Sequence, residues 1–477
     1  MTHPKLHPDR ALPADPATRA AAREIHAATR DLPLLCLHGH VEASLLADDA
    51  PFGDPAELFV TPDHYLTRML VSQGVAMEAL GIAGRDPAAL PAETDPRAIW
   101  RTFCEHWHLF RGTPTRFWLE YELVEVLGVT GTPSRKTADA LYDEIAARLA
   151  EPAFRPRALF ERFGIEVLAT TDSALSTLAD HARIRADGWR GEVVPTFRPD
   201  SLLHPGRTGW PAEIAALAGL TGVDTGSYDG FLAALRARRR AFAEAGALAT
   251  DHGHATAASE RLPAAEAARI YAEALAGGAD PAAAGAFAGH MLHVMAEMSR
   301  DDGLVMQIHP GVLRDHDPGV LAAYGPDRGF DIPAGAEFTR ALRPLLASFG
   351  RDPGLRLIVY TTDETTYSRE LAPLAGVYPA LRLGAPWWFL DSPDGLRRYR
   401  EAVTDSAGFY NTTGFVDDTR AFLSIPARHD LARRADAGHL ARLVAEHRLT
   451  LAEAVETAVD LAYDLPRRAF GISSPGA

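Results

Sequence analysis

The stretch Leu32–His40, LPLLCLHGH, is an apolar run that ends in two histidines one residue apart. A short apolar run bounded by polar segments predicts a buried strand. Because successive side chains of a strand point to opposite faces, Leu34, Cys36, His38 and His40 are expected to share one face. The two imidazoles then point the same way from the carboxyl end of the predicted strand.

Seven more apolar runs follow, and segments rich in helix-forming residues separate them. A repeated order of strand and helix predicts a parallel sheet, and eight such strands favour a (β/α)8 barrel. The predicted fold is therefore a distorted (β/α)8 barrel. The seven later runs are Ile165–Asp172, Gly191–Asp200, Gly246–His254, Leu304–His309, Leu355–Glu364, Ala380–Phe389 and Thr412–Arg420.

The first two predicted strands are far apart in the sequence. Residues 41–164 contain no strong strand pattern, and helical patterns and proline-rich turns dominate them. We therefore expect three parts: an N-terminal helix with strand 1 (1–40), a helical insertion packed over the barrel mouth (41–164), and the rest of the barrel (165–477).

Composition excludes several classes of protein. A net charge of -15 disfavours attraction to nucleic acid or to an anionic membrane. Two cysteines, Cys36 and Cys104, are too few for a disulfide scaffold or a multi-thiolate metal site. The N-terminal stretch lacks an apolar signal core, and no apolar run is long enough to cross a membrane. We expect a cytoplasmic protein without nucleic-acid or membrane partners.

Polar residues gather at the carboxyl ends of the predicted strands, which form the mouth of a barrel. Two histidines at such a position can bind a divalent cation once a carboxylate joins them. The spacing alone is equally compatible with two structural histidines bonded to the backbone. Cys36 lies deeper and is expected in the core.

Several motifs, taken in order, resemble the uronate (glucuronate) isomerases of the amidohydrolase superfamily. They are HGHVEA at His38, PDHYLTRMLVSQGV at Pro62, VVPTFRPD at Val193, TDH at Thr250, QIHPGVLRDHD at Gln307, LGAPWWF at Leu383 and DTRAFLSIPARHD at Asp418. Each motif alone is short, but together they span more than 350 residues in one order. The resemblance implies an aldose-ketose isomerase that converts D-glucuronate to D-fructuronate, and D-galacturonate to D-tagaturonate.

The resemblance also assigns roles to residues. His38, His40 and Asp418 match metal ligands, and Asp418 is also the expected catalytic base. Neighbouring residues of a strand face opposite ways, so only one of Asp417 and Asp418 can reach the mouth, and the Thr-Arg that follows favours Asp418.

The remaining matched residues concern the substrate. A guanidinium donates paired hydrogen bonds to a carboxylate, which suits an acidic sugar, although pairing with a neighbouring aspartate such as Asp200 is the alternative for each arginine. Tyr65 or His64 is expected to donate a proton, and Tyr65 can equally be an aromatic lid. The expected substrate-binding residues are Arg198, Arg420, His309 and Trp388, and His309 can alternatively be a metal ligand.

The ligand types suit zinc first, and manganese, iron or cobalt as well. Two alternatives stay open: a metal-dependent hydrolase acting on a sugar-acid lactone, and a non-catalytic protein that binds acidic sugars. The hydrolase interpretation is weakened because the sixth predicted strand ends in YTTDET, without the histidine that hydrolytic sites of this superfamily often have there to activate a metal-bound water. Alanine-rich helices can pack between subunits, so a homo-oligomer is expected.

Overall fold

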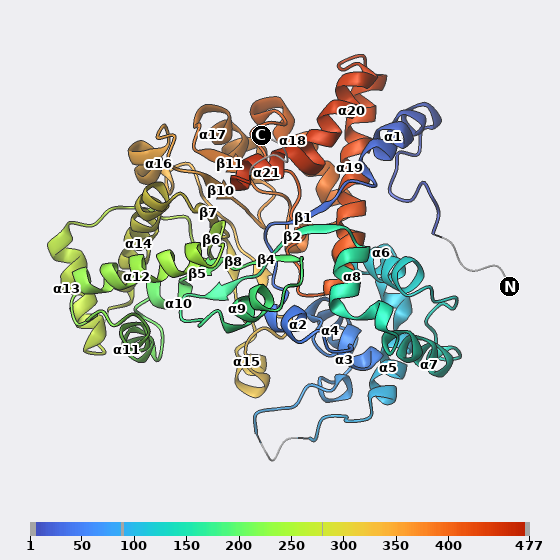
Figure 1. Ribbon diagram of the computed structural model, residues 1–477, viewed down its shortest axis with the longest axis horizontal. Coiled ribbons are helices and arrows are strands. Elements are labelled where there is room, and N and C mark those ends of the chain that lie inside the picture. The colour runs from blue at the N-terminus through green and yellow to red at the C-terminus, as the bar shows by residue number, and fades with distance from the viewer. Residues whose placement is uncertain (1–5, 87–89, 279, 473–477) are drawn as a thin grey trace.

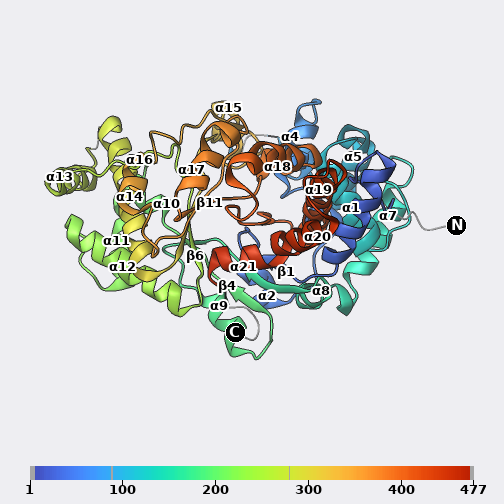
Figure 2. The same cartoon turned by 90° about the horizontal axis from the view of Figure 1, so that it is seen from above.

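The computed structural model describes residues 6–86, 90–278 and 280–472. Its strands lie at the centre of the molecule, and helices surround them (Figures 1 and 2). The strands are β1 Leu34–Cys36, β2 Ile165–Ala169, β3 Asp172–Ser173, β4 Glu192–Val194, β5 Phe197–Arg198, β6 Ala249–His252, β7 Val305–Ile308, β8 Val312–Leu313, β9 Ile332–Pro333, β10 Leu357–Val359 and β11 Leu381–Leu383.

Parallel pairing joins these strands in sequence order around the barrel. One sheet has the order β1-β2-β4, and a second has the order β11-β10-β7-β6-β5-β3. Strands β2 and β3 lie in one predicted run, as do β4 and β5, so the two sheets are continuous parts of one wall. Among the strands that the structure describes, β8 and β9 alone pair apart from it, as a two-stranded antiparallel ribbon.

The last predicted run, Thr412–Arg420, closes the ring without forming a regular strand. It makes an isolated parallel bridge from Thr412 to Leu383 on one side. On the other side the Asp418 amide donates to the His38 carbonyl over 3.1 Å, and the His40 amide donates to the Thr419 carbonyl over 2.9 Å. The predicted distorted (β/α)8 barrel is confirmed.

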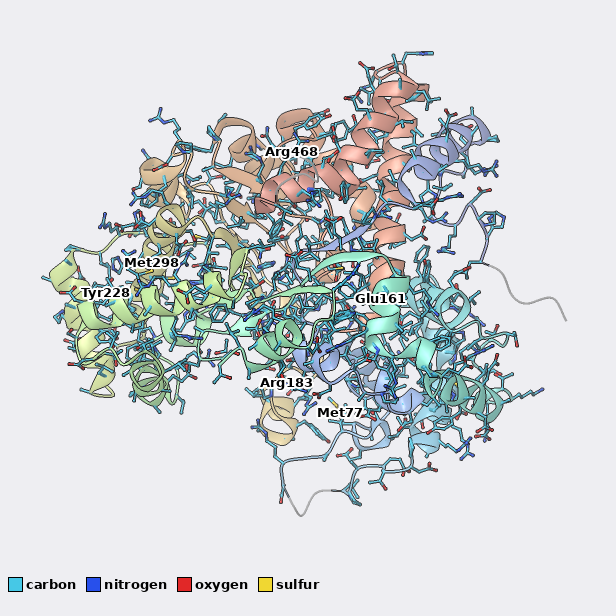
Figure 3. The ribbon with its side chains drawn as sticks, in the orientation of Figure 1. Met77, Glu161, Arg183, Tyr228, Met298 and Arg468 are labelled. Carbon is cyan, nitrogen blue, oxygen red and sulfur yellow. The ribbon has the colours of Figure 1, made fainter. Side chains whose placement is uncertain are left out.

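Apolar side chains fill the barrel interior. One buried cluster takes a side chain from each of several barrel strands, including Leu35, Val167, Val194, Ala249, Val305 and Ile358. A larger cluster lies between the wall and the helices outside it, where Tyr228 and Met298 are found (Figure 3). Burial of these two layers is the main force holding wall and helices together.

The side-chain alternation predicted for Leu34–His40 is wrong beyond the strand. β1 ends at Cys36, and its pairing with β2 is irregular between Leu34 and Leu35. Leu37 belongs to the interior cluster, whereas Cys36 packs outside the wall with its Sγ 3.9 Å from His429 Nε2. His38 faces inward like Leu37, because the chain leaves the extended conformation there.

Among the described residues between β1 and β2, the regular elements are all helical, and loops and turns join them. Acidic or hydroxyl caps start several of these helices, and proline occupies their first turn, which are strong start signals. Arg183 of α9 (Ala179–Ala186) pairs with Asp48 of α2 (Ala43–Asp48) over 2.7 Å, a surface contact between this part and the barrel (Figure 3). Its helices are α2 Ala43–Asp48, α3 Pro55–Phe59, α4 His64–Val71, α5 Pro96–Glu105, α6 Pro114–Tyr121, α7 Ala138–Leu149 and α8 Pro156–Arg162, with a π-helical turn at Glu122–Val126.

Most of the remaining helices cover the outside of the wall, and α1 packs on α19 and α20, whereas the short helix at residues 318–324 projects from the connection after β7 (Figure 1). They are α1 Pro16–Thr29, α9 Ala179–Ala186, α10 Asp200–Leu203, α11 Trp210–Thr221, α12 Tyr228–Glu244, α13 Ala264–Leu275, α14 Pro281–Asp302, α15 Pro318–Tyr324, α16 Arg343–Phe349, α17 Ala372–Val377, α18 Pro393–Ala407, α19 Ile425–Ala445, α20 Leu451–Val459 and α21 Leu465–Phe470. None of the helices described is long and apolar enough to cross a membrane.

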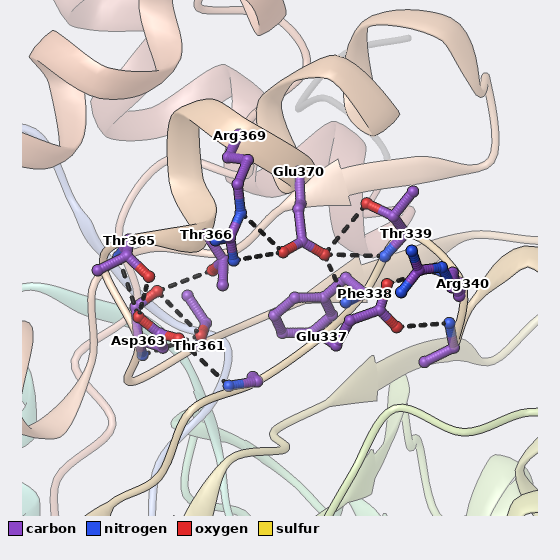
Figure 4. Close-up of polar contacts among 12 residues, drawn as sticks. Glu337, Phe338, Thr339, Arg340, Thr361, Asp363, Thr365, Thr366, Arg369 and Glu370 are labelled. Carbon is purple, nitrogen blue, oxygen red and sulfur yellow. Dashed lines mark hydrogen bonds and ion pairs between the residues drawn. The ribbon is translucent and has the colours of Figure 1, made fainter.

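The long connection after β7 is tied to the connection after β10. Glu370 accepts hydrogen bonds from the amides of Phe338 and Thr339 over 2.7 and 2.9 Å (Figure 4). Asp363 accepts one from the Ala336 amide over 3.2 Å. These two carboxylates fix the returning part of the loop, whose outward part reaches the barrel mouth at Arg314 and Asp327.

Candidate active site

A cavity of about 960 Å³ lies at the carboxyl ends of the barrel strands. Barrel residues and residues of the helical segment 41–164 line it together. This volume is typical of a small-molecule site. From the barrel come His38, His40, Arg198, Asp251, His309, Trp387, Trp388, Asp418 and Arg420, and from the helical segment come His64, Tyr65, Trp118 and Glu122.

Three histidines and one carboxylate meet at the base of this cavity. Asp418 Oδ1 lies 3.1 Å from His40 Nε2 and 3.6 Å from His38 Nε2. The ring of His309 stacks on the ring of His38 with centroids 4.6 Å apart. His38, His309 and Asp418 each offer a ligand atom, and these atoms lie within 4.8 Å of one another. The structure thus brings His309 into the group that the sequence predicted from His38, His40 and Asp418.

The donor set of this group fits a divalent cation. His38 Nδ1 and His309 Nε2 are buried without a hydrogen-bond partner, whereas His309 Nδ1 lies 2.7 Å from Asp251 Oδ1. Burial lowers the pKa of His38 to about 4, so its ring is neutral at pH 7 and can act as a ligand. Burial opposes ionisation of Asp418, but His38 and His40 outweigh it and hold the pKa of this carboxyl below its usual range. Imidazole nitrogens together with one carboxylate are a ligand set that suits zinc and similar ions.

Asp417 and Asp418 point to different sides of the wall. Asp417 is buried and its Oδ1 lies 3.3 Å from His429 Nε2, on the outer side with Cys36. Asp418 has a positive φ of 35°, an unfavourable conformation for a residue with a side chain, which turns its carboxylate toward the cavity. Strained backbone of this kind clusters at functional sites.

Arg198 lies between two carboxylates. Its Nη1 is 3.1 Å from Asp251 Oδ2, and its Nε donates to Asp200 Oδ2 over 2.8 Å. Asp251 also contacts His309, with Oδ1 2.7 Å from Nδ1. The pairing with Asp200 that the sequence left open is therefore present, and Arg198 still lines the cavity. Asp251 links the arginine to the histidine group.

Arg420 also lines the cavity. Its side chain is about half exposed, and its Nη1 donates to Asp327 Oδ2 over 2.5 Å. Asp327 belongs to the long connection after β7. Because Arg420 is paired but accessible, an anionic ligand can approach its free donors.

Helix α4 carries the other two predicted site residues. Asp63 caps this helix by accepting from the amides of Tyr65 and Leu66 over 2.7 and 3.3 Å. The cap fixes the first turn, from which His64 and Tyr65 enter the cavity. Burial lowers the pKa of His64 to about 4, and it raises the pKa of Tyr65.

Trp388 stands beside this turn. Its ring lies 5.7 Å from that of His64, and the Arg314 guanidinium sits 4.7 Å above the indole. Its φ of 52° is again in the left-handed region. Neighbouring Trp387 contacts the His309 ring edge-on at 4.8 Å. The two tryptophans form one apolar wall of the cavity.

Several lining residues were not assigned a role by the sequence, among them Asp251, Glu122 and Arg428. Asp251 stood among the polar strand ends, but its pairing with Arg198 and His309 depends on the fold. Glu122 lies in the π-helical turn after α6, and burial raises its pKa to about 8. Arg428 pairs with buried Asp391 over 2.5 Å. A buried glutamate within an apolar helical pattern was the only sequence signal for Glu122.

Comparisons with known proteins agree with this arrangement. The family model described as glucuronate isomerase matches residues 17–470. A protein named uronate isomerase from Rhizorhabdus wittichii is 55% identical over 466 residues, covering 98% of each chain. One of the same name from Rhizobium meliloti is 54% identical over 465 residues, covering 98% of this chain and 99% of the other.

Solved structures give the same result. The crystal structure of glucuronate isomerase from Caulobacter crescentus superposes with a TM-score of 0.96 at 51% identity, covering 99% of this chain and 98% of the other. The uronate isomerase from Thermotoga maritima superposes with a TM-score of 0.91 at 26% identity, covering 98% and 100%.

Proposed function

Because this chain belongs to the glucuronate isomerase family, we propose that it is an enzyme that converts D-glucuronate to D-fructuronate and D-galacturonate to D-tagaturonate. The observation that carries this function is the cavity itself. It places two arginines around a histidine and carboxylate group at the mouth of the barrel. A hexuronate needs both parts: cations for its carboxylate, and acid-base groups for its C1 and C2 atoms.

Arg198 and Arg420 are the proposed partners of the substrate carboxylate and hydroxyls. Each is already oriented by an aspartate, so little side-chain freedom is lost when an anion binds. The planar guanidinium donates two parallel hydrogen bonds to a carboxylate. Trp388 is proposed to pack against the sugar carbons.

Isomerisation moves a proton from C2 of the aldose to C1 of the ketose, and another between the two oxygens. We assign the C2 proton to the Asp418 carboxylate, which the neighbouring histidines keep ionised. His64 and Tyr65 are the proposed donors to the oxygens. Burial leaves the imidazole uncharged and the phenol protonated at pH 7, so both can donate a hydrogen bond there.

A divalent cation, zinc first and manganese, iron or cobalt as alternatives, is proposed on His38, His40 and Asp418, with His309 as a further ligand in place of its predicted substrate contact. When bound, it supplies positive charge next to the reacting oxygens. Asp251 holds His309 from behind, which fixes the ring orientation.

We further propose that residues 41–164 act as a cover for the barrel mouth, separate from the barrel parts 1–40 and 165–477. The proposed setting is the cytoplasm, with a homo-oligomer as the assembly and small hexuronates rather than nucleic acids or membranes as partners. Light scattering of the purified full chain tests the assembly.

Proton NMR of purified protein with each hexuronate tests the reaction. We expect ketose signals to grow as aldose signals decline, and no reaction of D-glucose, which lacks the carboxylate. Hydrolysis of a sugar-acid lactone without ketose formation would instead identify the hydrolase. Binding of either hexuronate by metal-loaded protein without turnover would identify a binding protein.

A further inference from the structure

The tripeptide His-Gly-His occurs twice in this chain, at residues 38–40 and 252–254, and both copies follow a barrel strand. The first copy lines the cavity. The second follows Asp251, whose side chain faces the cavity. Because neighbouring strand residues face opposite ways, His252 points away from the cavity toward the outer helices. His252 and His254 are indeed absent from the cavity lining.

Behind the wall, the second copy meets another carboxylate. Asp200, His252 and His254 each offer a ligand atom, and these atoms lie within 4.8 Å of one another. Asp200 begins α10, directly after β5, whereas His252 ends the adjacent strand β6. The Gly253 amide donates to both Asp200 oxygens over 3.0 Å, so the turn is built around this carboxylate.

Two ring nitrogens of this cluster are not satisfied by the protein, whereas His252 Nε2 lies 3.0 Å from Thr250 Oγ1. His252 is 0% exposed and His254 is 5% exposed, yet His252 Nδ1 and His254 Nε2 have no hydrogen-bond partner. A buried polar atom without a partner destabilises the folded state. In the comparable cluster of Cys36, Asp417 and His429, the side chains contact one another over 3.3 and 3.9 Å. The cluster of Asp200, His252 and His254 therefore has ring nitrogens left for a ligand, whereas the side chains of the Cys36 cluster already contact one another.

Charge also permits a cation here. Asp200 and Asp251 flank the single guanidinium of Arg198, so the local sum of these three groups is one negative charge. Burial lowers the pKa of His252 and of His254, to about 3 and about 4, so both rings are neutral at pH 7. Two neutral imidazoles and a carboxylate are a ligand set for zinc and similar ions.

We propose that Asp200, His252 and His254 bind a second divalent cation of the zinc type, on the outer side of the barrel wall. It joins the ends of β5 and β6 and holds the Asp200 carboxylate, which in turn positions Arg198. Its role is structural, since the cluster does not line the cavity. The proposal does not depend on the reaction assigned above.

Cobalt tests the proposal with the intact full-length chain. Chelated protein is dialysed against Co²⁺, and bound metal is counted by elemental analysis. We expect two ions per chain for the wild type, one for His254→Gln and one for His38→Asn. His293→Gln is the matched control and should keep two, because His293 is another buried histidine with an unpartnered Nε2. One ion in the wild type, or two in His254→Gln, would overturn the proposal.

Anomalous diffraction from cobalt-loaded wild-type crystals requires no variant to fold. A peak between Asp200, His252 and His254, in addition to one at His38 and Asp418, is the expected result. A peak at His38 and Asp418 alone refutes the second site.

Discussion

Replacement of Asp251 by asparagine tests how the cavity is organised. This carboxylate is 1% exposed and touches Arg198 Nη1 at 3.1 Å and His309 Nδ1 at 2.7 Å. Asparagine keeps the shape of the side chain but removes its charge. Its NH2 group is a donor and therefore cannot accept the hydrogen bond of one of the two groups, Arg198 or His309. We expect Asp251→Asn to bind substrate weakly and react slowly.

The magnitude follows from the two contacts. A hydrogen bond to a charged group contributes about 1.5–3 kcal/mol, and asparagine can retain part of one of them. A net loss of about 2–4 kcal/mol corresponds to a reduction in kcat/KM of about 30-fold to 1,000-fold. Arg198 keeps Asp200, so the variant should still fold.

Steady-state kinetics of ketose formation, with thermal unfolding measured in parallel, is the assay. Asp172→Asn is the control, since Asp172 also follows a barrel strand but does not line the cavity. It should retain kcat/KM within about threefold, because the Asp172 carboxylate contacts Thr170 and His181 rather than residues of the cavity. Wild-type kcat/KM in Asp251→Asn would refute the linkage between Arg198 and His309.

Two further outcomes are expected. Arg420→Met should raise KM for the hexuronate about tenfold, since one charge-assisted pair of about 1.5 kcal/mol is lost, while the melting temperature stays unchanged because the side chain is about half exposed; unchanged KM would remove Arg420 from the site. Burial opposes ionisation of Asp430, but His26, Arg10 and Arg434 surround this carboxylate and lower its pKa. The stability that the ionised group contributes is therefore fully present above the unfolded-state pKa of about 3.9, and it is lost as pH falls below that value. Asp430→Asn should therefore lower the free energy of unfolding by about 2 kcal/mol at pH 7 and flatten its fall below pH 4, measured by urea unfolding; equal pH dependence in variant and wild type would contradict this.

The barrel could be predicted because its strands are short apolar runs between helical segments. The site could be located because carboxyl ends of parallel strands meet at one edge. Alternation, however, predicts which way a side chain points only while the chain stays extended. At Leu37 and His38 the strand has ended, and two consecutive residues face inward.

A sequence pattern also does not predict local backbone strain. Asp417 and Asp418 lie on opposite sides as predicted, but this run is not a regular strand. The positive φ that turns Asp418 into the cavity accompanies closure of the ring against His38 and His40. The partners of Asp251 are 53 and 58 residues away along the chain, and only the folded wall brings them together. Contacts of this kind follow from tertiary structure.

A comparison of Asp418→Asn with Asp417→Asn tests the central claim most directly. Both substitutions preserve the shape of the side chain, and the two residues lie on opposite sides of the wall. Ketose formation from D-glucuronate is followed by proton NMR with metal-loaded protein. The account predicts that Asp418→Asn loses activity by at least about 1,000-fold, while Asp417→Asn, if folded by circular dichroism, retains turnover. Turnover in Asp418→Asn at the wild-type rate would contradict the assignment of the reaction to this carboxylate.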